Sequence, residues 1–164
     1  MGGTRYLVTY YSRTGNTRKV AQAIFDALPE PKEIRPIDAV ESLDPYDLTF
    51  VGFPLWQFAP APPAADFLKA KCAHARIALF HTQGSQPDYW QVAEIEERVR
   101  GACPADVVDR FSCQGEVSED VIQMIESLPQ YAKFAAAARG TKGLPGADAL
   151  AAAGAFARRV AGIF

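Results

Sequence analysis

Residues 6–17 read Tyr6-Leu7-Val8-Thr9-Tyr10-Tyr11-Ser12-Arg13-Thr14-Gly15-Asn16-Thr17, and the rest of the chain is organised around this stretch. Its first half is apolar, aromatic and β-branched, which is typical of a buried strand. A short loop rich in hydroxyl groups follows. A helix is predicted directly after the loop because Val20, Ala21, Ile24 and Leu28 recur at helical spacing.

A loop of this kind in front of a helix is suited to bind an anion. The first N–H groups of a helix have no acceptor within it, and the helix dipole favours negative charge there. Gly15 allows a close backbone approach, and Arg18 and Lys19 in the first turn would be relieved by a bound anion. Four side chains can donate hydrogen bonds to it: Ser12, Thr14, Asn16 and Thr17. The alternative is an ordinary connection in which Asn16 caps the helix.

The composition of the chain is that of a globular protein. The 164 residues carry a net charge of −2 and form no basic cluster, which argues against nucleic-acid binding. Apolar runs are far too short to span a membrane, and the N-terminus lacks the apolar segment of a secretory signal. Cys72, Cys103 and Cys113 are odd in number and make no zinc or Cys-x-x-Cys pattern, which suits a reducing compartment. We therefore expect one domain over residues 1–164, in the cytoplasm, without a metal site.

Strand and helix patterns alternate along the rest of the chain. Further strands are predicted at residues 32–35, 48–53, 75–82 and 106–113, the first of them a weak edge strand. Further helices are predicted at residues 63–71, after Trp90, after Ser118, at 130–139 and from Asp148. This alternation predicts an α/β protein with an open parallel sheet covered on both faces.

Three loops are expected to leave the carboxyl ends of central strands, where such sheets bind ligands: residues 12–17, 54–58 and 82–90. The first is suited to a phosphate group. The other two are rich in aromatic residues and proline, which suits surfaces that hold a flat molecule.

These three loops make the chain resemble the flavodoxin-like family of FMN proteins. The resemblance is carried by Ser12-Arg13-Thr14-Gly15-Asn16-Thr17 after the first strand, by Trp56 after the third and by residues 84–90 after the fourth. It spans nearly the whole chain and implies a doubly wound five-stranded parallel sheet of order 2-1-3-4-5 with helices on both faces. Residues 111–115 and the helices after them also resemble a branch of the family distinct from the electron-carrier flavodoxins.

The resemblance implies FMN as the cofactor, with its phosphate in the loop at residues 12–17. The flavin ring would lie between the Trp56 loop and the loop that holds Tyr89 and Trp90, with Tyr89 at the ring. The implied cofactor-binding residues are Ser12, Arg13, Thr14, Gly15, Asn16, Thr17, Pro54, Leu55, Trp56, Gln57, Phe58, Thr82, Gln83, Gly84 and Tyr89. In contrast to the electron-carrier flavodoxins, residues 55–58 contain no glycine.

The implied function is that of an FMN-binding redox protein that carries electrons to a partner oxidoreductase. A small NAD(P)H-dependent FMN or quinone-type reductase and a flavin-free partner-binding domain are the alternatives. A receiver domain would need an acidic pair where Tyr11 and Ser12 stand, so that class is excluded. No residue stands out as catalytic: a structural role is expected for His81 at the end of a central strand, and Cys113 is expected to be an inert buried thiol.

Overall fold

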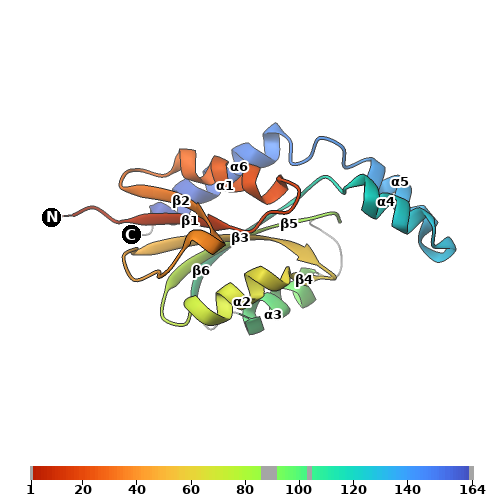
Figure 1. Ribbon diagram of the computed structural model, residues 1–164. Helices are drawn as coiled ribbons and strands as arrows, with labels where there is room; N and C mark the ends of the chain where they lie inside the picture. The colour runs from red at the N-terminus through yellow and green to blue at the C-terminus, as the bar shows by residue number, and fades with distance from the viewer. Residues whose placement is uncertain (1, 86–91, 103–104, 163–164) are drawn as a thin grey trace.

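The structure is a computed structural model that describes residues 2–85, 92–102 and 105–162 (Figure 1). Its strands are β1 (Tyr6–Tyr10), β2 (Lys32–Pro36), β3 (Leu48–Trp56), β4 (Ala59–Pro60), β5 (Arg76–Gln83) and β6 (Asp106–Gln114). Its helices are α1 (Asn16–Ala27), α2 (Pro62–Lys71), α3 (Val92–Ala102), α4 (Glu119–Glu126), α5 (Ala132–Arg139) and α6 (Ala147–Ala161), with the 3-10 turns η1 (Ile37–Ala39) and η2 (Pro129–Tyr131). Within the described ranges, no helix is long and apolar enough to cross a membrane.

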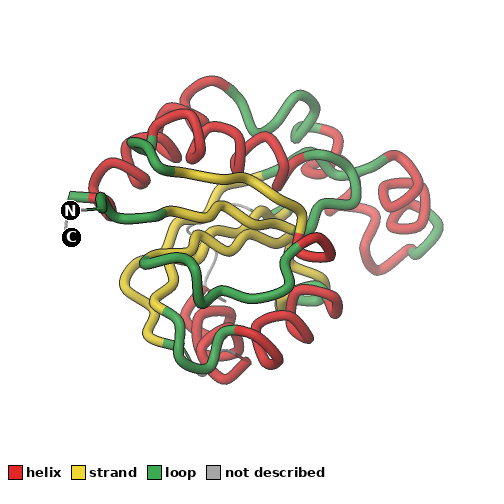
Figure 2. Tube along the Cα trace, turned by 60° about the vertical axis from the view of Figure 1, so that its left-hand side comes forward, coloured by secondary structure: helices red, strands yellow, loops and turns green. Residues whose placement is uncertain are grey.

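The long strands form one parallel sheet in the order β2-β1-β3-β5-β6. The two-residue strand β4 lies off this path and pairs antiparallel with β3. Without β4, the strands taken in chain order run 2-1-3-4-5, so the predicted sheet order is confirmed. Helices α1 and α6 cover one face of the sheet, and α2 and α3 cover the other (Figures 1 and 2).

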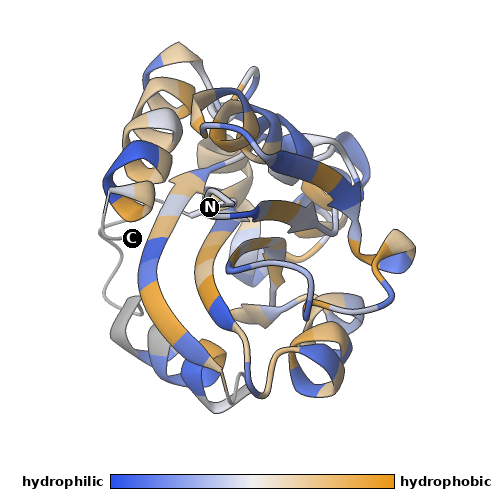
Figure 3. Cartoon of the chain, turned by 90° about the vertical axis from the view of Figure 1, so that its left-hand side faces the viewer, coloured by the Kyte–Doolittle hydropathy of each residue, from blue (hydrophilic) through white to orange (hydrophobic). Residues whose placement is uncertain are grey.

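The core consists of two apolar layers, one on each face of the sheet. Neighbouring residues of a strand point to opposite faces, so Val8 packs in the layer under α1 and α6 while Leu7 packs in the layer under α2. Phe50 and Val51 of β3 divide in the same way. Figure 3 shows hydrophobic residues recurring along the central strands. Burial on both faces explains why these strands are continuous apolar runs.

The loop predicted at residues 54–58 is wrong in part, because β3 continues through Trp56 and folds back onto β4. The turn between them is made by Gln57 and Phe58, whose φ angles of 50° and 63° are both left-handed. Turns with two left-handed central residues match the twist of a tight hairpin. Residue Gln83, which was expected in the next loop, likewise belongs to β5.

Beyond β6 the chain forms a helical hairpin, residues 117–146, which we call the arm. It projects away from the rest of the molecule at the end of the sheet where the strands finish (Figures 1 and 2). Its own small core contains Ile122, Ala135 and Ala138. Arg139 joins the two helices through Glu126 at 2.7 Å and Glu119 at 3.2 Å. The helix predicted at residues 130–139 is divided into η2 and α5.

The sheet is packed too closely at Gly52 to accept a side chain. A Cβ atom there would lie 2.0 Å from Cε2 of the fully buried Phe80. We expect Gly52→Ala to lower the free energy of unfolding by about 1–3 kcal/mol through overpacking, as measured by urea denaturation. The control is Gly101→Ala in α3, where a Cβ would meet no described atom within 4 Å. Equal stability of the two variants would contradict the packing argument.

Candidate functional site

Three segments that carry predicted site residues follow neighbouring strands of the sheet. β1 pairs with β3, and β3 pairs with β5, all in parallel. Residues 11–15 follow β1, the turn at Gln57 and Phe58 follows β3, and Gly84 follows β5. Because carboxyl ends of parallel strands meet at one edge, the fold brings these segments to the same end of the sheet.

The segment after β1 forms a loop, which we call the anion loop (residues 12–17). Gly15 directly precedes α1 with a left-handed φ of 98°, and it offers no capping side chain. Ser12 Oγ accepts hydrogen bonds from the N–H groups of Gly15 at 3.1 Å and Arg18 at 3.3 Å. Among the described residues, the N–H groups of Thr14, Asn16 and Thr17 have no acceptor. The first turn of α1 also lacks an acidic residue, so this helix end is open to an anion.

Two side chains of the anion loop fasten it to the sheet. Thr17 Oγ1 and Thr82 Oγ1 lie 2.8 Å apart in a buried hydrogen bond. Asn16 Nδ2 donates to the carbonyl oxygen of Glu116 at 2.8 Å, and Gly115 is packed against the same amide. Asn16 therefore holds the loop to the chain after β6 and does not cap the helix. What Asn16 and Thr17 offer to an anion is their backbone N–H groups.

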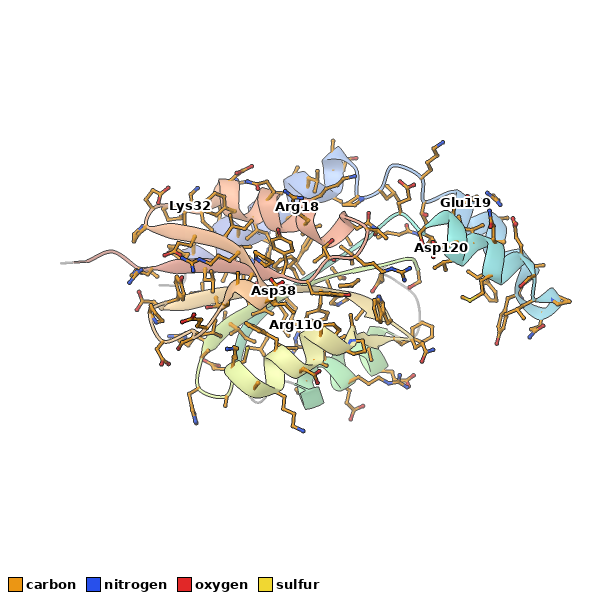
Figure 4. All side chains as sticks on the ribbon, viewed as in Figure 1. Arg18, Lys32, Asp38, Arg110, Glu119 and Asp120 are labelled. Carbon is orange, nitrogen blue, oxygen red and sulfur yellow. The ribbon has the colours of Figure 1, made fainter. Side chains whose placement is uncertain are left out.

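The positive charges near the loop lie on exposed side chains. Arg13 Nη2 forms an ion pair with Asp120 Oδ2 of the arm at 3.2 Å. The pKa of Asp120 is lowered from its ordinary value, chiefly by a hydrogen bond from Ser118. Arg18 lies on α1 and makes no ion pair with a described residue (Figure 4). Both guanidinium groups are free to reorient toward a bound anion, because an exposed ion pair is weak.

The hairpin after β3 presents aromatic surface at this edge. Trp56 is 38% exposed and Phe58 is 40% exposed, which is unusual for such large apolar side chains. Tyr11 packs edge-on against Trp56, with ring centroids 6.1 Å apart. Sequence reasoning did not include Tyr11 in the site, although its position beside Ser12 gave a signal. Tyr89 and Trp90 lie outside the described residues.

Comparison with known proteins identifies the family. The family model described as a flavodoxin domain matches residues 7–145. The chain belongs to the flavodoxin family. Its relatives include the flavodoxin-like domain-containing protein BilS of Clostridioides difficile (strain CD3), which is 30% identical over 119 residues. That match covers 69% of this chain and 67% of BilS.

Solved structures agree on the flavodoxin fold. A flavoprotein from Lactobacillus acidophilus NCFM, crystallised in complex with FMN, is 20% identical with a TM-score of 0.50, over 67% of this chain and 93% of its own. The flavodoxin of Streptococcus pneumoniae TIGR4 is 15% identical with a TM-score of 0.51, over 83% and 98% of the two chains. At these identities the likeness establishes the fold.

Two buried titratable side chains, His81 and Cys113, lie near the carboxyl ends of β5 and β6. His81 is 8% exposed and stacks on Phe53 with centroids 6.0 Å apart, and its Nδ1 has no partner among the described residues. Burial, and then the charge of Arg110, lower its pKa to about 4. Burial raises the pKa of Cys113 to about 11. His81 is therefore neutral and Cys113 is a buried thiol near pH 7.

The buried imidazole makes stability depend on pH. The unfolded chain protonates His81 below its ordinary pKa of 6.5, whereas the folded chain does so only near pH 4. The neutral imidazole therefore makes its full contribution to the free energy of unfolding above pH 6.5. Roughly 3 kcal/mol of this stability is lost as the pH falls toward 4. We expect His81→Phe to remove this loss in urea unfolding measured between pH 7 and pH 4. His74→Phe, at an exposed turn, should retain it. Parallel pH profiles for wild type and His81→Phe would show that His81 is not the cause.

Proposed function

We propose that this flavodoxin-family protein binds FMN and carries electrons to a partner oxidoreductase in the cytoplasm. The observation that carries the proposal is the open N-terminus of α1 at the same sheet edge as the exposed Trp56. A phosphate group and a flat apolar ring are the two chemically distinct parts of FMN, and each has a matching surface here. The family assignment and the FMN complex of the structural neighbour support this choice.

The phosphate of FMN is assigned to the anion loop. The free N–H groups of Thr14, Asn16 and Thr17 and the hydroxyl group of Ser12 supply neutral donors, and the dipole of α1 adds to them. Gly15 keeps the loop open, since a Cβ there would meet no described atom within 4 Å. Arg13 within the loop and Arg18 in the first turn of α1 supply positive charge. These residues fit a phosphate dianion without a dedicated basic pocket.

The flavin ring is assigned to the surface between the β3–β4 hairpin and the end of β5. Trp56 supplies the platform, with Gln57 and Phe58 at the turn, while Pro54 and Leu55 hold the hairpin on the sheet. Thr82 and Gln83 are buried and support this surface from below. Gly84 follows them and has no side chain, which lets the chain pass close to Val117; a Cβ there would lie 2.8 Å from Val117. Tyr89 belongs to the same proposed set but lies outside the described residues.

Bound FMN supplies the redox chemistry, and the residues of the chain set its environment. Aromatic side chains at the ring displace water, and an environment poor in water opposes added negative charge. His81 is neutral and buried, so it does not place a positive charge beneath the ring. The protein therefore favours the oxidised cofactor, which suits a donor of electrons.

The surface near the site favours docking through apolar contacts. The arm exposes Met124, Leu128, Tyr131 and Phe134, while its carboxylates Glu119 and Glu126 are paired with Arg139. With a net charge of only −2, the protein offers little long-range attraction to a basic partner. Electron transfer to the partner should accordingly depend weakly on salt.

A stand-alone reductase that takes electrons from NAD(P)H is the second candidate. It is favoured by one observation, a cavity lined by Tyr11 and Ser12 next to the anion loop. Anaerobic mixing of the FMN-loaded protein with NADH and, separately, with NADPH distinguishes the two functions. Loss of the flavin absorbance without a second protein identifies a reductase, and unchanged absorbance identifies a carrier.

FMN binding is tested by titration with FMN and with riboflavin, which lacks the phosphate group. Quenching of flavin fluorescence should show tighter binding of FMN. Ser12→Ala should weaken FMN by about tenfold and leave riboflavin unchanged, because it removes one hydrogen bond to a charged group. Trp56→Leu should weaken both flavins, because both carry the ring.

Ser42→Ala provides the matched control, since Ser42 accepts a hydrogen bond from Asp44 N in the β2–β3 connection. It should leave both affinities unchanged. Equal binding of FMN and riboflavin would contradict the role of the anion loop. Failure of the folded protein to bind either flavin would contradict FMN binding and favour the alternative of a flavin-free partner-binding domain.

A further inference from the structure

A cavity of about 550 Å³ lies on the side of the sheet that α2 covers. Tyr11 and Phe67 contribute aromatic side chains from the layer under α2, and Asp38 and Asp66 line it from η1 and α2. This volume falls in the range of pockets for small molecules, and aromatic walls with a few polar groups are typical of them. Asp38 belongs to η1, directly after β2, and Figure 4 shows it on the side of the sheet where α2 lies.

The cavity results from a short connection between β2 and β3. In an alternating α/β chain a helix usually lies between two such strands. Here the connection contains only the three-residue turn η1. The end of β2 is therefore left uncovered beside α2, and the cavity occupies the space between them.

The charges of the cavity select for hydrogen-bond donors. Asp38 and Asp66 form no hydrogen bond or ion pair with any residue in the described ranges. Lys71 also lines the cavity, but its Nζ donates to the carbonyl oxygen of Glu41 at 2.6 Å. Two free carboxylates repel a phosphate group and accept hydroxyl or amino hydrogens. The part of a ligand that lies in the cavity should thus carry hydrogen-bond donors and no phosphate group.

The place of Asp38 in the fold indicates which class of ligand the cavity takes. It stands just after the end of β2, about twenty residues after Gly15, which is where dinucleotide-binding folds place the acid that accepts the hydroxyl groups of a ribose. Ser12 belongs to the anion loop and also lines the cavity. The cavity therefore adjoins the anion loop, to which the phosphate of FMN is assigned.

We propose that this cavity binds the adenosine moiety of an adenine nucleotide whose ribose has a free 2′-hydroxyl group. The 2′-hydroxyl group of the ribose donates to Asp38, and the adenine ring lies against the side chains of Tyr11 and Phe67. NADH and free adenine nucleotides share this chemistry. Binding itself does not depend on FMN, whereas a role of the site in accepting electrons from NADH rests on the reductase function proposed above.

The test is calorimetric titration of the FMN-loaded and FMN-free protein with adenosine, 2′-deoxyadenosine and adenosine 2′-monophosphate. Adenosine should bind at least about tenfold more tightly than 2′-deoxyadenosine, because the latter cannot donate its 2′-hydroxyl to the carboxylate. The 2′-phosphate should be rejected. Asp38→Asn should reduce the affinity for adenosine by a similar factor, leave that for 2′-deoxyadenosine unchanged and leave FMN binding unchanged.

Asp44→Asn is the matched control, because Asp44 lies in the same connection and does not line the cavity. Anaerobic reduction of bound FMN by NADH, with a KM raised by Asp38→Asn at constant kcat, identifies a dinucleotide as the source of the adenosine. Adenosine binding without reduction by NADH identifies a free adenine nucleotide. Equal affinity for adenosine and 2′-deoxyadenosine, or no saturable binding of adenosine to the folded protein, would overturn the proposal whether or not FMN binds.

Discussion

The N-terminus of α1 is held against the sheet by the hydrogen bonds of Thr17 to Thr82 and of Asn16 to Glu116. The rest of the site depends on this attachment. Because the side chains fasten the helix, its first N–H groups stay unpaired at the carboxyl edge of the strands. An unpaired helix end is costly in an apolar setting but favourable beside an anion. The backbone N–H groups therefore remain available to a ligand, because the side chains of Asn16 and Thr17 make the contacts that hold the helix in place.

The sheet and the anion loop were predictable because their signals are local. Strands buried on both faces are apolar runs, and the loop stands directly between such a run and a helical pattern. The β3–β4 hairpin had no such signal, since Gln57 and Phe58 are not residues that usually adopt left-handed angles. The cavity at Asp38 was not predictable either. It depends on which element fails to cover the end of β2, and that is a property of the packing.

The position of the arm could not be predicted from the sequence either. The periodicity of α4 and α5 identified their apolar sides, but it did not show that they pack on each other and away from the sheet. Its root is held by the Asn16 contact and by Val117 N donating to Thr141 Oγ1 at 2.9 Å. The exposed Arg13–Asp120 pair adds little by itself. The arm is therefore anchored to the rest of the molecule at the anion loop.

Tyr11 connects the two surfaces to which ligands are assigned. Its ring packs edge-on against Trp56 and also lines the cavity that contains Asp38. In the proposed arrangement, a flavin on one side and an adenosine moiety on the other are separated by aromatic side chains in direct contact. A ligand that orders Tyr11 from the cavity side also restricts Trp56, and by linkage the same coupling acts in the opposite direction. The anion loop begins directly beside Tyr11, because Tyr11 and Ser12 are consecutive residues after β1.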